Sequence, residues 1–333
     1  MDIPTSSVNS FPEESTDSNT LSVVVPCYNE SENLQSLHAR LLTVLTALPF
    51  HIELIYVDDG SKDDTADQVR MLNSSGIVLR LIALSRNFGK EIAMTAGLEH
   101  TTGDAAIVID ADLQDPPEVI PLLIAEWQAG FDVVYAQRTI RHGETWLKTL
   151  TARAFYRVIR AISGSVDIPK NTGDFRLLSR RAVDALLLLR ERHRFMKGLF
   201  SWIGFPQKAV NYERDPRYAG TSKWNYWALW NFSLEGITSF STAPLRLATY
   251  VGACSAVLAF GYGVYIAFKA MLFGDPVQGY PSLMVVITFL GGVQLVTMGI
   301  IGEYLGRTFN EAKQRPLYFV QENSVISQSA DDD

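Results

Sequence analysis

Carboxylates and an amide recur at every second position within the stretch Ile107–Pro117. Three apolar residues open this stretch, and Asp110, Asp112 and Gln114 follow them. The apolar run is typical of a buried strand, and the two prolines at the end fit the start of a helix. The carboxylates would then share one side of the carboxyl end of a strand, where open α/β sheets bind ligands. Because neighbouring carboxylates repel, the pattern predicts a divalent cation, Mg²⁺ or Mn²⁺, with Gln114 as a further oxygen ligand.

An isolated pair of aspartates at this spacing is more often a solvated loop. Here the apolar strand before the pair, the glutamine and the prolines all favour the metal site. Strands and helices also alternate around the stretch, which predicts an α/β fold with a doubly wound, mostly parallel sheet. Asn29, with Glu32 three residues on, is predicted to cap the first helix. Further strands are predicted at Leu21–Val25, Ile52–Val57, Val78–Leu84 and Val133–Ala136.

Polar loops follow the first three predicted strands as well. Tyr28 and Glu30 follow the first strand, Asp58 and Asp59 the second, and Lys90 the third. On its own, an aspartate pair before glycine is a turn signal. Together with the aspartates of the fourth strand, however, these loops are expected to line one edge of one sheet. Neither G-x-G-x-x-G nor G-x-x-x-x-G-K-[ST] occurs, so a pyrophosphate bound here would need another positive charge, which a metal would supply.

Several motifs resemble a known family. The stretches Val24–Glu30, Val57–Ser61 and Asp110–Asp115 resemble the inverting family 2 glycosyltransferases, which have the GT-A fold. The stretches Leu84–Glu91 and Trp224–Phe232 resemble one branch of it, the polyprenyl-phosphate glycosyltransferases, and within that branch the bactoprenol glucosyltransferases. The resemblance covers nearly all of the chain except its two ends. The Q-x-x-R-W motif of processive polysaccharide synthases is absent, which argues against polymer synthesis.

The resemblance implies roles for individual residues. Asp110, Asp112 and Gln114 match the metal-binding positions. Asp174 matches an acid near the sugar, and whether it acts as a base or contacts the donor sugar or an arginine stays open. Arg138 and Lys223 resemble the parts that face the acceptor phosphate. The nucleotide-sugar site is predicted at Pro26, Tyr28, Glu30, Asp58, Asp59 and Lys90.

The C-terminal third of the chain has the pattern of a membrane protein. Two uncharged runs, Leu247–Phe268 and Ser282–Gly302, are each long enough to cross a hydrocarbon core of about 30 Å as a helix. The loop between them carries Asp275 and no Lys or Arg, so both ends of the pair are predicted on the cytoplasmic side. The basic residues that flank the two runs are Arg246, Arg307, Lys313 and Arg315.

Two segments before these runs are predicted to lie at the membrane surface. Arg153, Arg157 and Arg160 share one face of an amphipathic helix, although such arginines are equally often a solvated face. Three tryptophans lie between residues 224 and 230, as in an interfacial aromatic belt. The predicted organisation is a disordered tail (1–20), a cytoplasmic GT-A domain (21–223), an interfacial segment (224–246), two membrane helices (247–273 and 282–303) and a cytoplasmic tail (304–333).

Composition excludes several classes of protein. The net charge of -7 argues against nucleic acid as a partner, because binding to a phosphate backbone needs a basic face. The two cysteines do not suggest a disulfide framework, which fits a reducing compartment. The N-terminus has no basic region followed by an apolar core, so a signal peptide is not expected.

The predicted function is inverting transfer of a hexose, favoured as glucose from UDP-glucose, to polyprenyl (undecaprenyl) phosphate. The product would be a lipid-linked sugar donor for modification of cell-envelope glycans. We expect a multi-pass protein of the plasma (inner) membrane, with a homo-oligomer and a lipid-linked sugar flippase as further partners. The alternatives are a GDP-mannose-dependent mannosyltransferase and a non-catalytic membrane scaffold with a relict nucleotide pocket. A transporter subunit is disfavoured, because the two runs contain only one interior polar residue, Gln294, and no charge.

Overall fold

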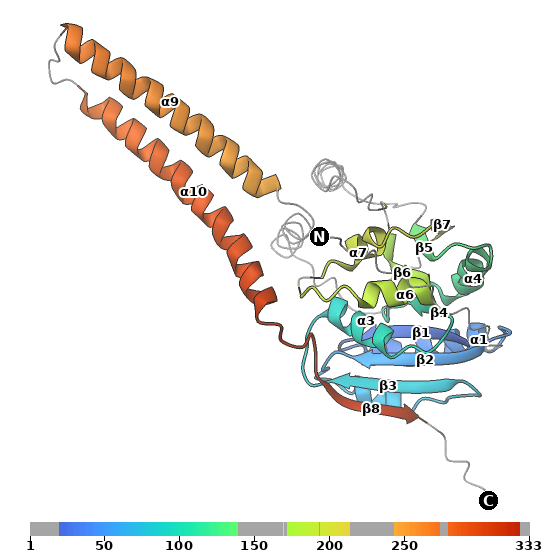
Figure 1. The fold of residues 1–333 in the computed structure, drawn as a ribbon. Coiled ribbons are helices and arrows are strands. Elements are labelled where there is room, and N and C mark those ends of the chain that lie inside the picture. Colours follow the sequence, from blue (N-terminus) through green and yellow to red (C-terminus); the bar gives the residue numbers. More distant parts are fainter. Residues whose placement is uncertain are drawn as a thin grey trace, which may run out of the picture.

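One mixed sheet organises the part of the chain that the structure describes. This computed structural model describes residues 20–138, 169, 172–192, 194–213, 243–273 and 279–326. Within these residues, eight strands form one sheet in the order β7-β5-β6-β4-β1-β2-β3-β8 (Figure 1). The strands are β1 (Thr20–Cys27), β2 (His51–Asp58), β3 (Val78–Leu84), β4 (Ala105–Val108), β5 (Val133–Arg138), β6 (Thr172–Ser179), β7 (Gln207–Tyr212) and β8 (Val320–Ile326).

The α/β fold and the mostly parallel sheet predicted from the sequence are confirmed. Strands β4, β1, β2 and β3 pair in parallel in that order, and β5 pairs in parallel with β7. Strand β6 is antiparallel to both β4 and β5, and β8 is antiparallel to β3. The sequence pattern did not predict β6, β7 or β8. The site therefore draws on a strand, β6, that alternation alone did not indicate.

Strand β4 is shorter than the pattern predicts. It ends at Val108, residues 111 and 112 form a turn, and Leu113 has a φ of +59°. The prediction that Asp110 and Asp112 share one side of a strand is therefore wrong, because the strand ends before them. The turn nevertheless leaves both aspartates and Gln114 half-exposed while the residues between them are buried.

Helices cover both faces of the sheet and form two hydrophobic cores. On one face lie α1 (Ser31–Leu45), α2 (Thr65–Arg70), the short η1 (Pro117–Val119) and α4 (Ile120–Gln128). On the other lie α3 (Lys90–Glu99), α6 (Arg180–Leu187) and α7 (Met196–Trp202). In α1 the leucines recur at helical spacing, and each buried leucine stabilises the fold by about 2 kcal/mol. Those leucines are Leu34, Leu37, Leu41 and Leu45, all fully buried.

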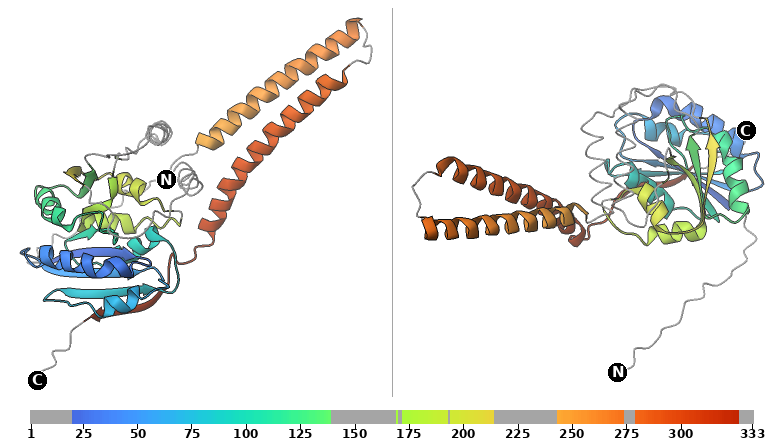
Figure 2. Two further views of the ribbon diagram at one scale, coloured as in Figure 1. Left: turned by 180° about the vertical axis from the view of Figure 1, so that it is seen from behind. Right: turned by 90° about the horizontal axis from the view of Figure 1, so that it is seen from above.

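Two long apolar helices form a hairpin that projects from the sheet domain (Figures 1 and 2). Helix α9 spans Ala243–Phe273 and α10 spans Tyr280–Ala312, so α10 continues past the end predicted at residue 303. Both helices are long and apolar enough to cross a membrane, and most of their large side chains are exposed. Their length and composition allow membrane association, and the crossing itself stays a prediction. The amphipathic helix and the interfacial segment up to residue 242 lie outside the described residues.

The segment after residue 303, predicted as a cytoplasmic tail, contains two ordered elements, and its place on the cytoplasmic side stays a prediction. Helix α10 extends to Ala312, and residues 320–326 form the edge strand β8. The backbone N–H of Ser85 donates to the carbonyl of Phe319 (2.9 Å), where β8 approaches the end of β3. Arg70 on α2 pairs with Glu322 on β8 at 2.5 Å. The strand was missed because its sequence is polar, and its backbone pairing with β3 supplies the order.

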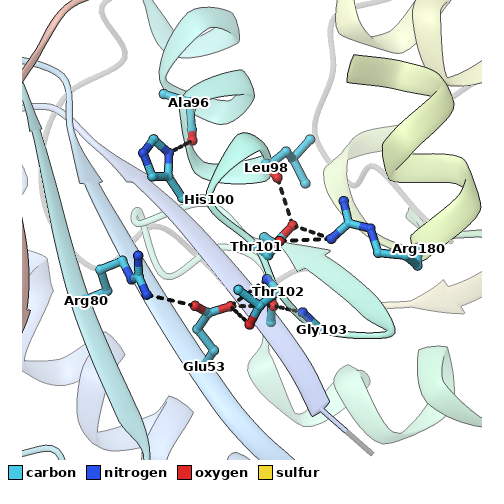
Figure 3. Close-up of polar contacts among 10 residues, drawn as sticks. Glu53, Arg80, Ala96, Leu98, His100, Thr101, Thr102, Gly103 and Arg180 are labelled. Atoms are coloured by element: carbon cyan, nitrogen blue, oxygen red, sulfur yellow. Dashed lines mark hydrogen bonds and ion pairs between the residues drawn. The ribbon is translucent and has the colours of Figure 1, made fainter. Parts of the chain in front are cut away.

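A buried carboxylate fixes the turn between α3 and β4 (Figure 3). Glu53 Oε2 accepts hydrogen bonds from Ser22 Oγ (2.7 Å) and from the backbone N–H of Thr102 (3.0 Å), and its Oε1 lies 3.5 Å from Arg80. Arg180 Nη1 donates to the carbonyl of Thr101 (2.9 Å) from the opposite side. Because β4 starts just beyond this turn, the network sets where β4 and its aspartates lie.

We expect Glu53→Ala to destabilise the protein by about 2–3 kcal/mol, because the buried donors around it lose a charged acceptor. Thermal unfolding of the purified variant in detergent measures the effect as a lower Tm. Glu32→Ala, which removes an exposed carboxylate from α1, is the matched control and should leave the Tm nearly unchanged. Equal Tm values for Glu53→Ala and wild type would show that the network does not stabilise the turn.

Candidate functional site

The Lys90 ammonium joins two carboxylates at the carboxyl edge of the sheet. Lys90 is the first residue of α3, Asp110 follows β4 and Asp174 lies in β6. Lys90 Nζ is 2.6 Å from Asp110 Oδ1 and 2.5 Å from Asp174 Oδ2. The structure therefore brings together three of the residues predicted for different parts of the site.

Electrostatic interactions keep Lys90 and Asp174 charged. Burial opposes the charged form of Lys90, but Asp110 and Asp174 outweigh it and raise the pKa of the ammonium above its usual range. Burial likewise opposes ionisation of Asp174, yet Lys90 and Lys197 hold the pKa of this carboxyl well below its usual range. Asp174 is thus an ionised partner of Lys90 in this structure, and such a carboxylate is a weak proton acceptor.

Asp110, Asp112 and Gln114 offer oxygen ligands of the kind that Mg²⁺ and Mn²⁺ take. Asp112 Oδ1 accepts from the backbone N–H of Gln114 (3.2 Å), which holds the turn. In the part of the chain that the structure describes, no group of three or more His, Cys, Asp or Glu side chains is placed to hold a metal ion. The donor set suits a hard cation that completes its shell with water and substrate phosphates, since Mg²⁺ is often bound by only one or two carboxylates.

Asp59 positions the loop that leads to Lys90. Both of its oxygens accept backbone hydrogen bonds, from Phe88 N (2.7 Å) and Gly89 N (2.9 Å). Gly89 has a φ of +102°, a conformation that favours glycine. A Cβ on Gly60 would lie 2.4 Å from the backbone of Arg86, so glycine is required where the two loops touch. Asp59 therefore holds the backbone that precedes Lys90 in place. Its contact with a nucleotide stays a prediction.

Asn29 does not cap the first helix, which corrects the sequence prediction. The N-cap residue is Glu30, without a side-chain cap hydrogen bond. Asn29 has a φ of +54°, and its side-chain oxygen instead accepts from Lys62 N at 2.8 Å. Asp58 accepts from the backbone N–H of Ser61, as expected for the turn. The loops after β1 and β2 are thus bonded to each other.

The remaining nucleotide-site candidates belong to the first of these loops. Pro26 is buried at the end of β1, and Tyr28 and Glu30 are half-buried beyond it. The backbone N–H of Glu30 donates to Thr65 Oγ1 (3.0 Å), which ties this loop to the start of α2. Their contacts with a nucleotide stay predictions. Lys223 lies outside the described residues.

A second buried cluster supports the site, and the sequence indicated only part of it. Asp115, fully buried, accepts a hydrogen bond from the Tyr212 hydroxyl. Arg138 Nε donates to the same hydroxyl (3.3 Å), and its Nη2 lies 3.8 Å from Asp115. Burial opposes the charge on Arg138, but Tyr212 and Asp115 outweigh it and raise its pKa. Tyr212 gave no signal in the sequence, because the pattern did not predict β7.

Glu91 and Arg176 also lie at the site without having been predicted there. Arg176 stacks over the Phe200 ring at 3.7 Å and donates to the carbonyl of Gly173 (2.9 Å). Burial lowers its pKa to about 10. Glu91 Oε2 accepts from the backbone N–H of Met196 (3.2 Å). Burial, with the neighbouring Asp174 carboxylate, raises the pKa of Glu91 to about 7.

The raised pKa of Glu91 predicts a pH-dependent stability. Above the usual value of 4.5 the unfolded chain ionises this carboxyl while the folded chain keeps it protonated, so stability falls between about pH 4.5 and pH 7. Glu91→Gln keeps an acceptor for Met196 N–H but cannot ionise. We therefore expect the Tm of Glu91→Gln to rise relative to wild type between pH 5 and pH 8. Parallel Tm-against-pH curves for the two proteins would contradict the assignment.

Comparison with known proteins identifies the family. Residues 22–187 match Glycosyl transferase family 2, and residues 243–308 match the GtrB C-terminal hairpin. An uncharacterized glycosyltransferase of Synechocystis sp. is 53% identical over 302 residues, 91% of this chain and 95% of the relative. Bactoprenol glucosyl transferase of Shigella phage SfX is 48% identical over 301 residues, 90% of this chain and 98% of the relative.

A solved structure is similar at a greater distance. Glucosyl-3-phosphoglycerate synthase from Mycobacterium tuberculosis is 24% identical, with a TM-score of 0.46, and the match covers 67% of this chain and 78% of that one. That similarity says nothing about the ligands of this chain. The near full-length relatives confirm the family resemblance seen in the motifs. The chain belongs to glycosyltransferase family 2.

Proposed function

We propose that this chain transfers glucose from UDP-glucose to the phosphate of a polyprenyl lipid. The observation that carries the proposal is the 48% identity to bactoprenol glucosyl transferases over 90% of the chain, together with the match to the GtrB C-terminal hairpin. The charged cluster of Lys90, Asp110 and Asp174 supports it. A relict pocket without activity would not need an ammonium placed between two carboxylates at this edge of the sheet.

The donor is proposed to bind across the loops after β1, β2 and β3. The loop residues Pro26, Tyr28, Glu30 and Asp58 would hold the nucleoside. Lys90 would lie beside the diphosphate, where its charge opposes the negative charge that develops on the leaving group. Asp59, which holds the backbone before Lys90, would keep that ammonium in place.

The acceptor needs little activation. Its phosphate has a second pKa near 6 and is largely ionised at neutral pH, so an oxygen is already nucleophilic. Attack on C1 of glucose forms the new C1–O bond from the face opposite the diphosphate, the bond to UDP breaks, and the anomeric configuration inverts. No strong base is required, which fits the low pKa of Asp174. Arg138 and Lys223 are proposed to align the acceptor phosphate, and Tyr212 fixes Arg138 for this task.

A divalent metal is proposed as cofactor. Held by Asp110, Asp112 and Gln114, Mg²⁺ or Mn²⁺ would offset the charge of the diphosphate. Asp110 also pairs with Lys90, so this carboxylate links the metal position to the ammonium. The choice between the two metals does not follow from oxygen ligands alone.

The hairpin α9–α10 is proposed to anchor the enzyme in the plasma membrane with its sheet domain in the cytoplasm. The basic residues after the apolar part of α10 support this orientation. A lipid-linked glucose made there must cross the membrane before it modifies envelope glycans. A flippase for that lipid is therefore a proposed partner, as is a second copy of this chain.

The direct test supplies purified protein and undecaprenyl phosphate with a panel of nucleotide sugars. We expect UDP-glucose to give a labelled lipid-linked sugar at a rate at least tenfold above GDP-mannose and the other donors. Faster transfer from GDP-mannose would favour the mannosyltransferase alternative. Absence of turnover with every donor would favour the scaffold.

The metal is tested with Asp112→Asn, which keeps the size of the side chain but removes a charged ligand. We expect transfer to fall by about 100-fold or more, because a ligand to the charge-neutralising cation is lost. EDTA should abolish wild-type activity, and Mg²⁺ or Mn²⁺ should restore it. Wild-type activity in chelator would contradict the metal assignment. Glu32→Gln, on the exposed face of α1, is the control.

A further inference from the structure

Helix α3, which carries Lys90, is held at both ends by residues far away in the sequence. In its first turn, Glu91 Oε2 accepts from the backbone N–H of Met196, the first residue of α7 (3.2 Å). At its last residue, Glu99 Oε1 accepts from Arg190 Nη1 (2.6 Å). Glu99 Oε2 accepts from the hydroxyl of Tyr318, which follows the apolar hairpin. The position of Lys90 is thus tied to the α6–α7 loop (residues 188–195) and to the chain beyond α10.

The α6–α7 loop is in turn bonded to the end of α10. The backbone N–H of Arg192 donates to Glu311 Oε1 at 2.7 Å, and Glu311 lies in the last turn of α10. A cavity of about 620 Å³ lies at this joint, between residues 190–192 and residues 311–317. Because a cavity separates the end of α10 from the α6–α7 loop, side-chain packing alone does not fix one against the other. The hydrogen bond from Arg192 N–H to Glu311 therefore contributes more to holding them together.

The α6–α7 loop carries Arg194, a buried charge that is stable only in a defined position. Its side chain is 4% exposed, and Nη1 donates to the carbonyl of Leu189 (2.5 Å), whereas Nε and Nη2 have no hydrogen-bond partner in the described structure. A buried guanidinium is stable only near opposite charge, and the neighbouring Glu191 supplies it. A shift of the loop would move this charge relative to Glu91, directly beside Lys90.

We infer that Glu311 is a positioning residue, through which the end of α10 sets the place of Lys90 by way of the α6–α7 loop and α3. The inference rests on the proposed function for its kinetic readout. The position of the apolar hairpin relative to the sheet domain then affects the rate of glucosyl transfer itself, in addition to any binding of the lipid acceptor.

The test compares full-length Glu311→Ala, Glu311→Gln and wild type in detergent. The alanine removes the acceptor for Arg192 N–H, and glutamine restores an acceptor oxygen. We expect Glu311→Ala to lower kcat by about tenfold with both undecaprenyl phosphate and a short, water-soluble isoprenyl phosphate, because misplacement of a catalytic group slows both reactions. Glu311→Gln should stay within about twofold of wild type. Glu303→Ala, on the same helix and paired only with Arg307 in the described contacts, is the matched control and should be unchanged.

A loss confined to the KM for undecaprenyl phosphate would overturn the inference, because Glu311 would then act only on lipid capture. So would an equal loss in Glu311→Gln, which keeps the acceptor oxygen.

Hydrogen exchange provides a readout that does not depend on activity. In Glu311→Ala, we expect faster exchange of the amides in residues 192–198 and also at the start of α3, residues 89–95. Faster exchange limited to the α6–α7 loop would overturn the inference, since the effect would not reach α3. If wild type transfers no glucose from UDP-glucose, the proposed function fails, and this exchange pattern still decides the inference by itself.

Discussion

The ion pairs between Lys90 and the carboxylates of Asp110 and Asp174 are the interaction on which the site depends. They join the first turn of α3, the end of β4 and the antiparallel strand β6 at one edge of the sheet. Without the ammonium, Asp110 and Asp174 would lose the positive charge that lies within hydrogen-bond distance of both. The surrounding structure serves this arrangement. Asp59 holds the backbone before Lys90, and the Glu53 network sets the turn from which β4 starts.

The topology explains why the apolar hairpin and the site are coupled. Helices α9 and α10 follow β7 and precede β8, so the hairpin is an insertion within the sheet and not an appended tail. Strand β8 returns to the edge beside β3, where Arg70 pairs with Glu322. Removing the hairpin together with everything after it would therefore also remove an edge strand. A proposed lipid substrate and a soluble nucleotide sugar must meet in one site, and this topology fixes the sheet domain close to the end of α10.

The sequence predicted the parts of the fold that have strong periodicity. The strands from β1 to β5 are apolar runs followed by polar loops, and their common edge was correctly expected to gather charged residues. Strands β6 and β7 were missed because they follow a long region without clear alternation. Tyr212 therefore could not be assigned to the site, although Asp115 was part of a recognised motif. Local rules also failed where tertiary contacts prevailed. Asn29 satisfies a neighbouring loop instead of capping a helix, and the turn after Val108 replaces the expected strand.

The most direct test of the central claim is glucose transfer from UDP-glucose to undecaprenyl phosphate by wild type and by Lys90→Met, measured side by side at saturating Mg²⁺. Methionine keeps much of the length of the side chain and removes only the charge that joins Asp110 and Asp174. We expect wild type to turn over and Lys90→Met to lose about 100-fold or more in kcat, with Lys90→Arg intermediate. A Lys90→Met protein that transfers glucose at the wild-type rate would contradict the central claim.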